Sequence, residues 1–440
     1  MPKPKFLKPL LIGCACALPI GLVVGLSVNW EHRQFISSLG SSGVKPFVEA
    51  FAKTYHNAHT NTDVIVEAGG SNYAIEQLSK GLTNIGNNSN NPWYVVNRDG
   101  YKDKWDNKKT FTLGYEGVVM MYNLPSGIEN KDAFKLAINE NNILDLYAVF
   151  SGFNESWMVD NEGNRTVYKW TKDEAKEKAS MYHYLTKESK DKLSDNDLQK
   201  AKDTAIIPYV RSGGNTNANS SIAFTYYSNL FEKFDDFETS VTPNQLNAFT
   251  GGQYGRDRYC HETEEANARA YELFHKDNLP GAMTFLTSGF IIPEGNQKMI
   301  KKAGYKFAGY KPRGTNQIFK LETKQDLDKL CLHQGGYNWF RPINCMIDLN
   351  NKKSKDFVYW IYFGSEKTPK DFCPEYKTTM RNNGAKELNT QQFISMLDLD
   401  AAFFNDKMFG AKTSDLEIEK IRKKSSEENA KIYGALQWDL

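Results

Sequence analysis

Three short loops rich in glycine, serine and asparagine, each followed by an amphipathic helical pattern, constrain the fold of this chain more than any other feature. They span residues 40–43, 69–72 and 211–217. A helix start presents unpaired N–H groups and a partial positive charge, which together favour a small anion. Three such starts, one of them with Arg211, predict that the chain surrounds an oxyanion from several sides. The residue types leave one alternative open, in which serine and asparagine serve only as N-caps.

Strands are predicted to alternate with these helices. Residues 64–66 form a short buried strand in this prediction, 114–123 a longer one, and 205–210 a buried strand that leads directly to Arg211. The same alternation continues from about residue 280 to 365. The expected helices after the three loops cover about residues 46–55, 75–81 and 222–231. This pattern indicates an α/β fold in which ligands bind at the loops that leave the strand ends.

The first thirty residues differ from the rest. Lys3, Lys5 and Lys8 precede an uncharged apolar stretch over residues 9–28, which is long enough to span a bilayer. The lysines place the N-terminus in the cytoplasm and the body of the protein outside. Cys14, in Leu-Ile-Gly-Cys, resembles the acylated cysteine of a bacterial lipoprotein signal, so a cleaved lipoprotein and an uncleaved helical anchor both stay open. Either one predicts an extracytoplasmic protein held at a membrane.

Composition and motifs exclude several functions. The 55 basic and 53 acidic residues leave a net charge of +2, which gives no electrostatic case for nucleic acid. The chain has no phosphate-binding Walker loop and no paired nucleophile and base, so we expect no enzyme and no cofactor. No metal site is expected either, because the cysteines lack metal-ligand spacing. The four cysteines after the anchor allow three disulfide pairings, and free or structural cysteines are favoured: Cys260, Cys331, Cys345 and Cys373.

Two segments are rich in charge. Residues of about 160–203 carry many Lys, Asp and Glu residues and almost no valine or isoleucine, which predicts an inserted excursion of solvent-exposed helices. Residues 401–440 predict a charged helical tail. Neither pattern by itself indicates a binding role.

The order of the loops resembles the substrate-binding subunit of bacterial phosphate ABC importers. The similarity covers most of residues 36–365. After the first two loops, further similar segments follow in the same order: residues 84–89, 117–119, 146–152, 210–217, 280–286 and 337–342. The resemblance implies a type II periplasmic-binding-protein fold, with two α/β lobes joined by hinge strands and the ligand cleft between them.

Carried over position by position, the resemblance implies a set of phosphate contacts. They are Ser42, Ser71, Ser89, Arg211, Asn215, Thr216 and Asn217, with Ser41, Gly43 and Asn88 as further candidates. Ser89 stands where many members of the family have an aspartate, which leaves discrimination between phosphate and sulfate open. We expect Arg341 to brace the lobes rather than to touch the ligand.

The resemblance also divides the chain. It implies a membrane anchor or lipoprotein signal over residues 1–31, a first lobe over 32–115 and 288–400, a second lobe over 116–287 that contains the charged insertion, and the tail over 401–440. The crossings between lobes fall near Gly114 and Ser288 and predict the hinge.

The predicted function is capture of inorganic phosphate and its delivery to the subunits of an ABC-type permease. The protein is expected to act as a monomer, anchored at the extracytoplasmic face of the bacterial cell membrane. Two alternatives stay open. One is a surface adhesin on a binding-protein scaffold, and the other is a binder of another oxyanion such as sulfate.

Overall fold

The computed structural model of the 440-residue chain describes most of residues 33–389. The described ranges are 33–89, 100–105, 107–139, 155–159, 165–212, 259–261, 266–311, 315–330, 340–366 and 371–389, with positions 92, 96, 141–143, 145, 146, 149 and 337. Several predictions lie outside these ranges. They concern the anchor with Cys14, the loop residues Asn215, Thr216 and Asn217, the helix at 222–231, Cys331 and the tail.

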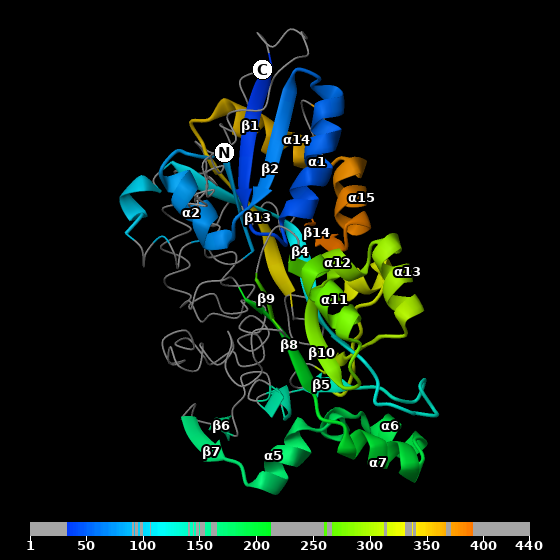
Figure 1. Cartoon of the computed structure of the whole chain (residues 1–440). Coiled ribbons are helices and arrows are strands. Elements are labelled where there is room, and N and C mark those ends of the chain that lie inside the picture. Colours follow the sequence, from blue (N-terminus) through cyan, green and yellow to red (C-terminus); the bar gives the residue numbers. More distant parts are fainter. Residues whose placement is uncertain are drawn as a thin grey trace, which may run out of the picture.

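The chain forms the following elements in order (Figure 1). The first part contains β1 (Gln34–Gly40), α1 (Lys45–Ala58), β2 (Thr62–Ala68), α2 (Ser71–Ser79), β3 (Ile85–Asn88), η2 (Lys102–Lys104), β4 (Lys108–Tyr122) and β5 (Ala137–Asn139). The middle part contains β6 (Glu155–Val159), β7 (Arg165–Lys169), α5 (Lys172–Ala179), η3 (Met181–Tyr184), α6 (Lys187–Lys192), α7 (Asp195–Asp203), β8 (Ile207–Ser212) and β9 (Tyr259–His261). The last part contains α11 (Ala266–Asp277), β10 (Ala282–Thr287), α12 (Ser288–Ile291), α13 (Glu294–Ala303), β11 (Lys306–Phe307), β12 (Gly309–Lys311), η5 (Lys324–Lys329), β13 (Phe340–Asp348), α14 (Lys352–Phe363), α15 (Pro374–Asn382) and β14 (Ala385–Glu387).

A mixed sheet runs through the molecule in the order β2-β1-β3-β13-β4-β10-β8-β9. β1 is parallel to β2 and β3, whereas β13 is antiparallel to β3 and β4. The long strand β4 pairs with β13 up to Gly117 and with β10 from Val118 onward. We therefore call the part around β1–β3 and β13 the upper half and the part around β8–β10 the lower half, as they lie in Figure 1. The predicted α/β class is confirmed.

Helices cover both faces of the sheet in the upper half (Figure 1). α1, α14 and α15 pack on one face through Phe47, Phe51, Phe357 and Tyr376, which belong to the main core. α2 covers the other face in a smaller cluster that includes Met346 of β13. Neighbouring residues of β13 thus point to opposite faces, as the two-residue period of a strand requires. The upper half therefore has three layers, with helices on both faces of the sheet.

In the lower half, α11 packs on β8, β9 and β10, and α12 and α13 follow at the end of β10. The segment of α5, η3, α6 and α7 lies at the bottom of the view in Figure 1. Its helices confirm the helical part of the predicted charged excursion. The excursion is not simply solvated, however, because Met181, Tyr184 and Ala201 are buried in the main core. Because charged residues dominate this segment, its sequence did not indicate that these few apolar side chains are buried.

A strand includes residues 64–66 as predicted, but the prediction that this strand is buried is wrong. β2 is an edge strand, and Ile65 is 49% exposed. The apolar triplet is β-branched, which favours a strand on an exposed edge as readily as in the core. The strand predicted at 114–123 begins earlier, at Lys108. The predicted start was too late because Thr110 and Thr112, which are polar but buried, interrupt the apolar alternation.

Ser288 joins three separate parts of the chain where the two halves meet. Its hydroxyl donates to the Gly384 carbonyl at 2.6 Å and accepts from the Gly117 amide at 2.8 Å. Gly384 has φ +77°, and a Cβ there would lie 2.1 Å from the Ser288 carbonyl oxygen. A glycine is therefore required at this contact. The contact falls at the strand position where β4 exchanges one partner for the other.

Two further properties concern the described ranges alone. No helix within them is long and apolar enough to cross a membrane. Cys345, which is buried, and Cys373 are free thiols in the structure, so these two do not pair with each other.

Candidate anion-binding site

The first predicted loop begins where β1 ends. The Ser41 amide donates to the Asn87 carbonyl of β3 at 2.9 Å, and the Ser41 carbonyl accepts from the amides of Val44 and Lys45. The second loop is tied to the first, because the Gly69 and Gly70 amides donate to the Gly40 carbonyl at 2.9 Å. The ends of three parallel strands are thus joined by backbone hydrogen bonds. The carboxyl ends of parallel strands are the usual place for a ligand in an α/β sheet.

The serines of these two loops are not N-caps. The N-cap of α1 is Val44 and that of α2 is Gly70, and neither makes a side-chain capping bond. In the same chain α5, α6 and α7 are capped by side chains, from Thr171, Thr186 and Ser194. The capping alternative is therefore wrong for the first two loops. Their hydroxyl groups are left for other partners.

Three serine hydroxyls converge instead. Ser41 Oγ donates to Ser89 Oγ at 3.1 Å, and Ser71 Oγ lies 3.4 Å from Ser89 Oγ. The Ser89 amide also donates to Ser71 Oγ at 3.3 Å. Ser41 and Ser89 are buried and Ser71 is half-buried. The loops after β1, β2 and β3 therefore bring their serines to one place.

Arg341 reaches this serine cluster from β13. Its Nη1 donates to Ser89 Oγ at 3.4 Å, and its Nε donates to Glu116 Oε1 at 2.6 Å. Both charged side chains are almost completely buried, with exposed fractions of 1% for Arg341 and 0% for Glu116. The strand register explains the contact: Asn344 is opposite Asn88, and Arg341 is opposite Glu116 on β4.

Some buried polar atoms at this place have no hydrogen-bond partner among the described residues. They include Ser42 Oγ, Arg341 Nη2 and Glu116 Oε2. A buried polar group that stays unpaired costs free energy, and a ligand that bonds to it would remove this cost. Ser42 is 7% exposed and directly follows Ser41 in the loop. The unpaired donors are thus a hydroxyl and a guanidinium, both suited to an oxyanion.

Gly43 is required by the guanidinium. A Cβ at residue 43 would lie 2.0 Å from Arg341 Nη2 and 2.8 Å from Glu116 Oε1. Gly289, in α12, approaches the same carboxylate from another side, because a Cβ there would lie 2.9 Å from Glu116 Oε2. The absence of a side chain at Gly43 allows the start of α1 to lie against the buried ion pair.

The electrostatics of the site favour an anion. Neither α1 nor α2 has an acidic residue in its first turn, so the partial positive charges of both helix starts are not neutralised locally. Arg341 adds a permanent positive charge and Glu116 offsets it. Within the described part of the chain no group of His, Cys, Asp and Glu side chains is arranged to hold a metal ion.

The predicted contacts fall into two groups. Ser41, Ser42, Gly43, Ser71 and Ser89 lie in the joined loops. Asn88 is buried at the end of β3, next to Ser89.

Arg211 belongs to β8 in the lower half, where it is paired in register with Cys260 of β9. Its side chain, and the residues Asn215, Thr216 and Asn217, lie outside what the structure describes.

Arg341 and Glu116 were missed as site residues by the loop patterns. Glu116 is the one charged residue of the apolar segment 114–123, and Arg341 is a buried charge in the strand 340–348, which ends in Asp348. A buried charge of each sign in two strands is a signal for a buried ion pair. The two residues are 225 positions apart in the sequence, which conceals that they are opposite one another.

The known proteins that are similar to this chain have low sequence identity to it. No family model matches the chain. An uncharacterized lipoprotein of Mycoplasma genitalium is 26% identical over 404 residues, which cover 86% of this chain and 92% of that protein.

Three solved structures are similar to this chain at low sequence identity. A putative phosphate ABC transporter substrate-binding protein from Clostridium perfringens, with bound phosphate, has a TM-score of 0.46 at 11% identity and covers 81% of this chain and 100% of its own. A phosphate-binding protein from Stenotrophomonas maltophilia has a TM-score of 0.46 at 12% identity, with 88% and 99% covered. A molybdate-binding protein from Azotobacter vinelandii has a TM-score of 0.35 at 11% identity, with 80% and 100% covered.

Proposed function

We propose that this protein captures an oxyanion, inorganic phosphate in the first place, and delivers it to an ABC-type permease. One observation carries the proposal: the loops after three parallel strands bring hydroxyl groups together beside a buried arginine, while Ser42 Oγ and Arg341 Nη2 have no partner in the described structure. The similar solved structures include phosphate and molybdate binders, which agrees with this class of ligand.

The chemistry of capture requires no reaction. Hydroxyl and backbone N–H donors replace the water molecules around the anion, and a guanidinium offsets part of its charge. Ser42, Ser71 and Ser89 supply hydroxyl groups from the upper half, and Arg211 with the loop that follows it is the proposed contribution from the lower half. Asn215, Thr216 and Asn217 complete the proposed set.

We propose that the halves move relative to one another about β4. The partner change of β4 at Gly117 and Val118, beside the buried Ser288 contact, supports a hinge at this place. The proposed lobes are residues 32–115 with 288–400, and 116–287. Closure of two lobes around a ligand would present both of them to a permease.

We propose that the N-terminal segment anchors the protein outside the cytoplasm. The lysines and apolar stretch of residues 1–31 support this, and the relative from Mycoplasma genitalium is named a lipoprotein. The choice between an acylated Cys14 and a helical anchor is tested by mass spectrometry of the mature N-terminus.

The function is tested by isothermal titration of the full chain in detergent with phosphate, sulfate and molybdate. We expect micromolar or tighter binding of phosphate. Ser42→Ala and Arg211→Ala should each weaken it about tenfold or more, since each removes a donor to a charged ligand. Ser194→Ala, in the cap of α7, is the matched control and should bind as the wild type does.

Each other outcome of this titration has a clear meaning. Equal binding of sulfate would keep the site and change the ligand, with Ser89 as the reason. No response to any of the three anions would contradict the proposal and favour an adhesin.

A further inference from the structure

We propose that Arg341 contacts the anion directly and that Glu116 is a positioning residue that limits how tightly the anion is held. The inference rests on the proposed function and adds to it two residues that the loop patterns did not contain. The geometry of the ion pair between Arg341 and Glu116 supports the inference, and not only the charges of these two residues.

The guanidinium of Arg341 is only partly used within the protein. Nε donates to Glu116 at 2.6 Å, Nη1 makes a long contact of 3.4 Å with Ser89 Oγ, and Nη2 has no partner among the described residues. The end of the guanidinium formed by Nη1 and Nη2 is therefore the part available to a ligand. That end matches an oxyanion, because two parallel N–H groups fit two oxygen atoms.

The same end of the guanidinium lies against the loop that carries Ser41 and Ser42. Nη2 lies against Gly43, the residue after Ser42, and Nη1 reaches Ser89. An anion bound by Ser42 and Ser89 is therefore within reach of Arg341. A guanidinium buried to 1% exposure retains a desolvation cost unless its N–H groups are bonded, and an anion would remove that cost.

Glu116 explains how such a site would release its ligand. Two arginines, Arg341 and the proposed Arg211, would hold an anion too firmly for transfer to a permease. Glu116 is buried beside Arg341, accepts from Nε, and offsets one of these positive charges. Its hydrogen bond with Nε also fixes the orientation of the guanidinium, so that Nη1 and Nη2 face the loop.

Calorimetric titration of full-length variants with inorganic phosphate tests the inference. Glu116→Gln should tighten binding about tenfold, since the repulsion between carboxylate and anion is lost. The double variant Glu116→Gln with Arg341→Gln should weaken binding at least about tenfold relative to the wild type. The double variant removes both charges together, because Arg341→Gln alone would leave the Glu116 carboxylate buried without a partner and threaten folding, whereas in Glu116→Gln the amide oxygen still accepts from Nε.

Two further variants keep the result interpretable. Arg381→Gln is the control, since Arg381 is also an ion-paired arginine, with Asp328 and Glu387 as its partners, but belongs to α15, away from the serine cluster. It should bind phosphate as the wild type does. Arg341→Lys retains the charge and loses the planar pair of N–H groups, so a direct contact predicts weaker binding even if the double variant folds poorly.

The outcomes separate this inference from the proposed function. Wild-type affinity in both the double variant and Arg341→Lys would show that the ion pair is only a structural brace, and would overturn the inference while the proposed function stands. Weaker binding by Glu116→Gln would overturn the role given to Glu116. A wild-type protein that binds no oxyanion would overturn the proposed function first, and this inference with it.

Discussion

At the scale of single residues, the same hydroxyl side chain has two different uses in this protein. Ser194 accepts a hydrogen bond from the Asp197 amide and caps α7. Ser71 opens α2 but does not cap it, and its hydroxyl lies with Ser41 and Ser89. The distinction separates stability from the proposed binding, because a cap acts on its helix, whereas the cluster serines are proposed contacts of a ligand.

This distinction predicts opposite effects of two serine substitutions. Ser194→Ala should reduce the free energy of unfolding by about 1 kcal/mol, the usual value of a capping bond, and leave phosphate affinity unchanged. Ser71→Ala should reduce phosphate affinity about tenfold and change stability less. Urea denaturation and calorimetric titration of both variants measure the two effects. The site would be contradicted if both substitutions changed stability alone.

The loop patterns singled out the serines of the candidate site and Arg211, but not Arg341 and Glu116. Glycine-rich loops mark Ser42 and Ser71 locally, so a linear pattern suffices to find them. Arg341 and Glu116 are brought together by strand register across 225 residues, and no local pattern contains that information. Serine caps are common, so the loops alone did not exclude the capping alternative, whereas the observed N-caps at Val44 and Gly70 do.

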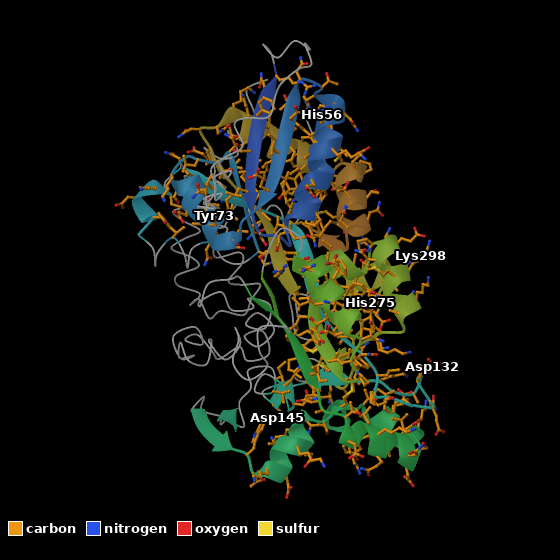
Figure 2. All side chains as sticks on the ribbon, in the orientation of Figure 1. His56, Tyr73, Asp132, Asp145, His275 and Lys298 are labelled. Carbon is orange, nitrogen blue, oxygen red and sulfur yellow. The ribbon has the colours of Figure 1, made fainter. Side chains whose placement is uncertain are left out.

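At the scale of elements, Asp145 holds the charged excursion to the body of the lower half (Figure 2). It is 5% exposed and accepts hydrogen bonds from Lys178 of α5 at 2.8 Å and from His183 of η3 at 2.9 Å. Burial alone raises the pKa of the Asp145 carboxyl, but the hydrogen bonds from His183 and Lys178 outweigh it, and the pKa is lowered overall. The carboxylate therefore contributes stability when it is ionised.

The lowered pKa predicts how Asp145 affects stability with pH. A carboxyl whose pKa is lower in the folded state contributes stability above its unfolded value of about 3.9, and loses it as the pH falls through the folded value. Asp145→Asn should thus lower the free energy of unfolding by about 1–3 kcal/mol at pH 7, with a smaller difference near pH 3. Thermal unfolding of wild type and variant at both pH values measures this.

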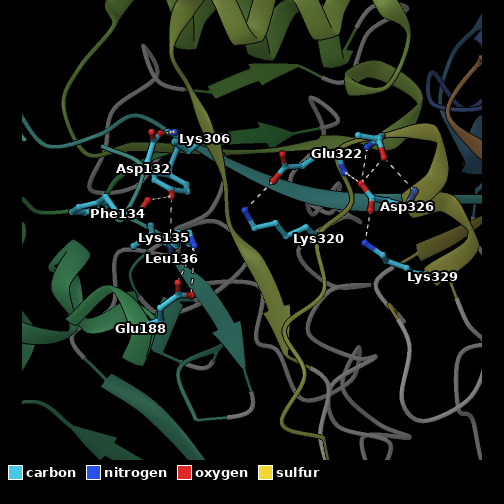
Figure 3. A network of polar contacts seen from close by, with 12 residues as sticks. Asp132, Phe134, Lys135, Leu136, Glu188, Lys306, Lys320, Glu322, Asp326 and Lys329 are labelled. Carbon is cyan, nitrogen blue, oxygen red and sulfur yellow. Dashed lines mark hydrogen bonds and ion pairs between the residues drawn. The ribbon is translucent and has the colours of Figure 1, made fainter. Parts of the chain in front are cut away.

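The control for Asp145 is Asp132, another aspartate of this part of the protein (Figure 3). Asp132 is paired with Lys306 at 3.4 Å, but its side chain is 99% exposed. Exposed ion pairs contribute little, so Asp132→Asn should unfold at the wild-type temperature. A difference between Asp145→Asn and wild type that stays constant from pH 7 to pH 3 would contradict the role of the ionised carboxylate.

Helices and strands were predictable where the apolar residues recur with one clear period, helical or strand-like. Helix α1 shows a clear helical spacing of buried residues and was predicted, as was the core of β4. The early part of β4 was not, because Lys109, Thr110 and Thr112 are polar and yet buried. Tertiary partners, rather than local pattern, determine burial there. The same holds for β1, which precedes the first loop and was not singled out.

At the scale of the whole molecule, one strand belongs to both halves. β4 pairs with β13 in the upper half and with β10 in the lower half, so a displacement between the halves must bend or twist this strand. The proposed anion contacts also come from both halves, with the serines and Arg341 in the upper half and Arg211 in the lower. An anion that contacts both should stabilise the assembled molecule and not one half alone.

This predicts a thermal shift that depends on the site. A ligand that binds only the folded state stabilises it by about 2.7 kcal/mol at one hundred times its dissociation constant. Phosphate and sulfate also stabilise proteins without binding to a site, because both are excluded from protein surfaces. The measurement is therefore the difference in unfolding temperature between phosphate and chloride at equal ionic strength, compared across variants. Wild type should show the full shift, and Ser42→Ala and Arg211→Ala, which are expected to bind about tenfold more weakly or worse, should show about half of the binding contribution or less, in addition to the small shift of excluded salt.

Asp145→Asn provides the control for this thermal shift. It removes the carboxylate that accepts from Lys178 and His183, so it should lower the unfolding temperature near pH 7. Because Asp145 is neither a proposed contact nor part of the proposed hinge, the additional shift caused by phosphate should stay at its wild-type size. A phosphate shift of the same size in Ser42→Ala and Arg211→Ala as in wild type would mean that the anion acts through the solvent. The site would then have to be abandoned, even with the fold unchanged.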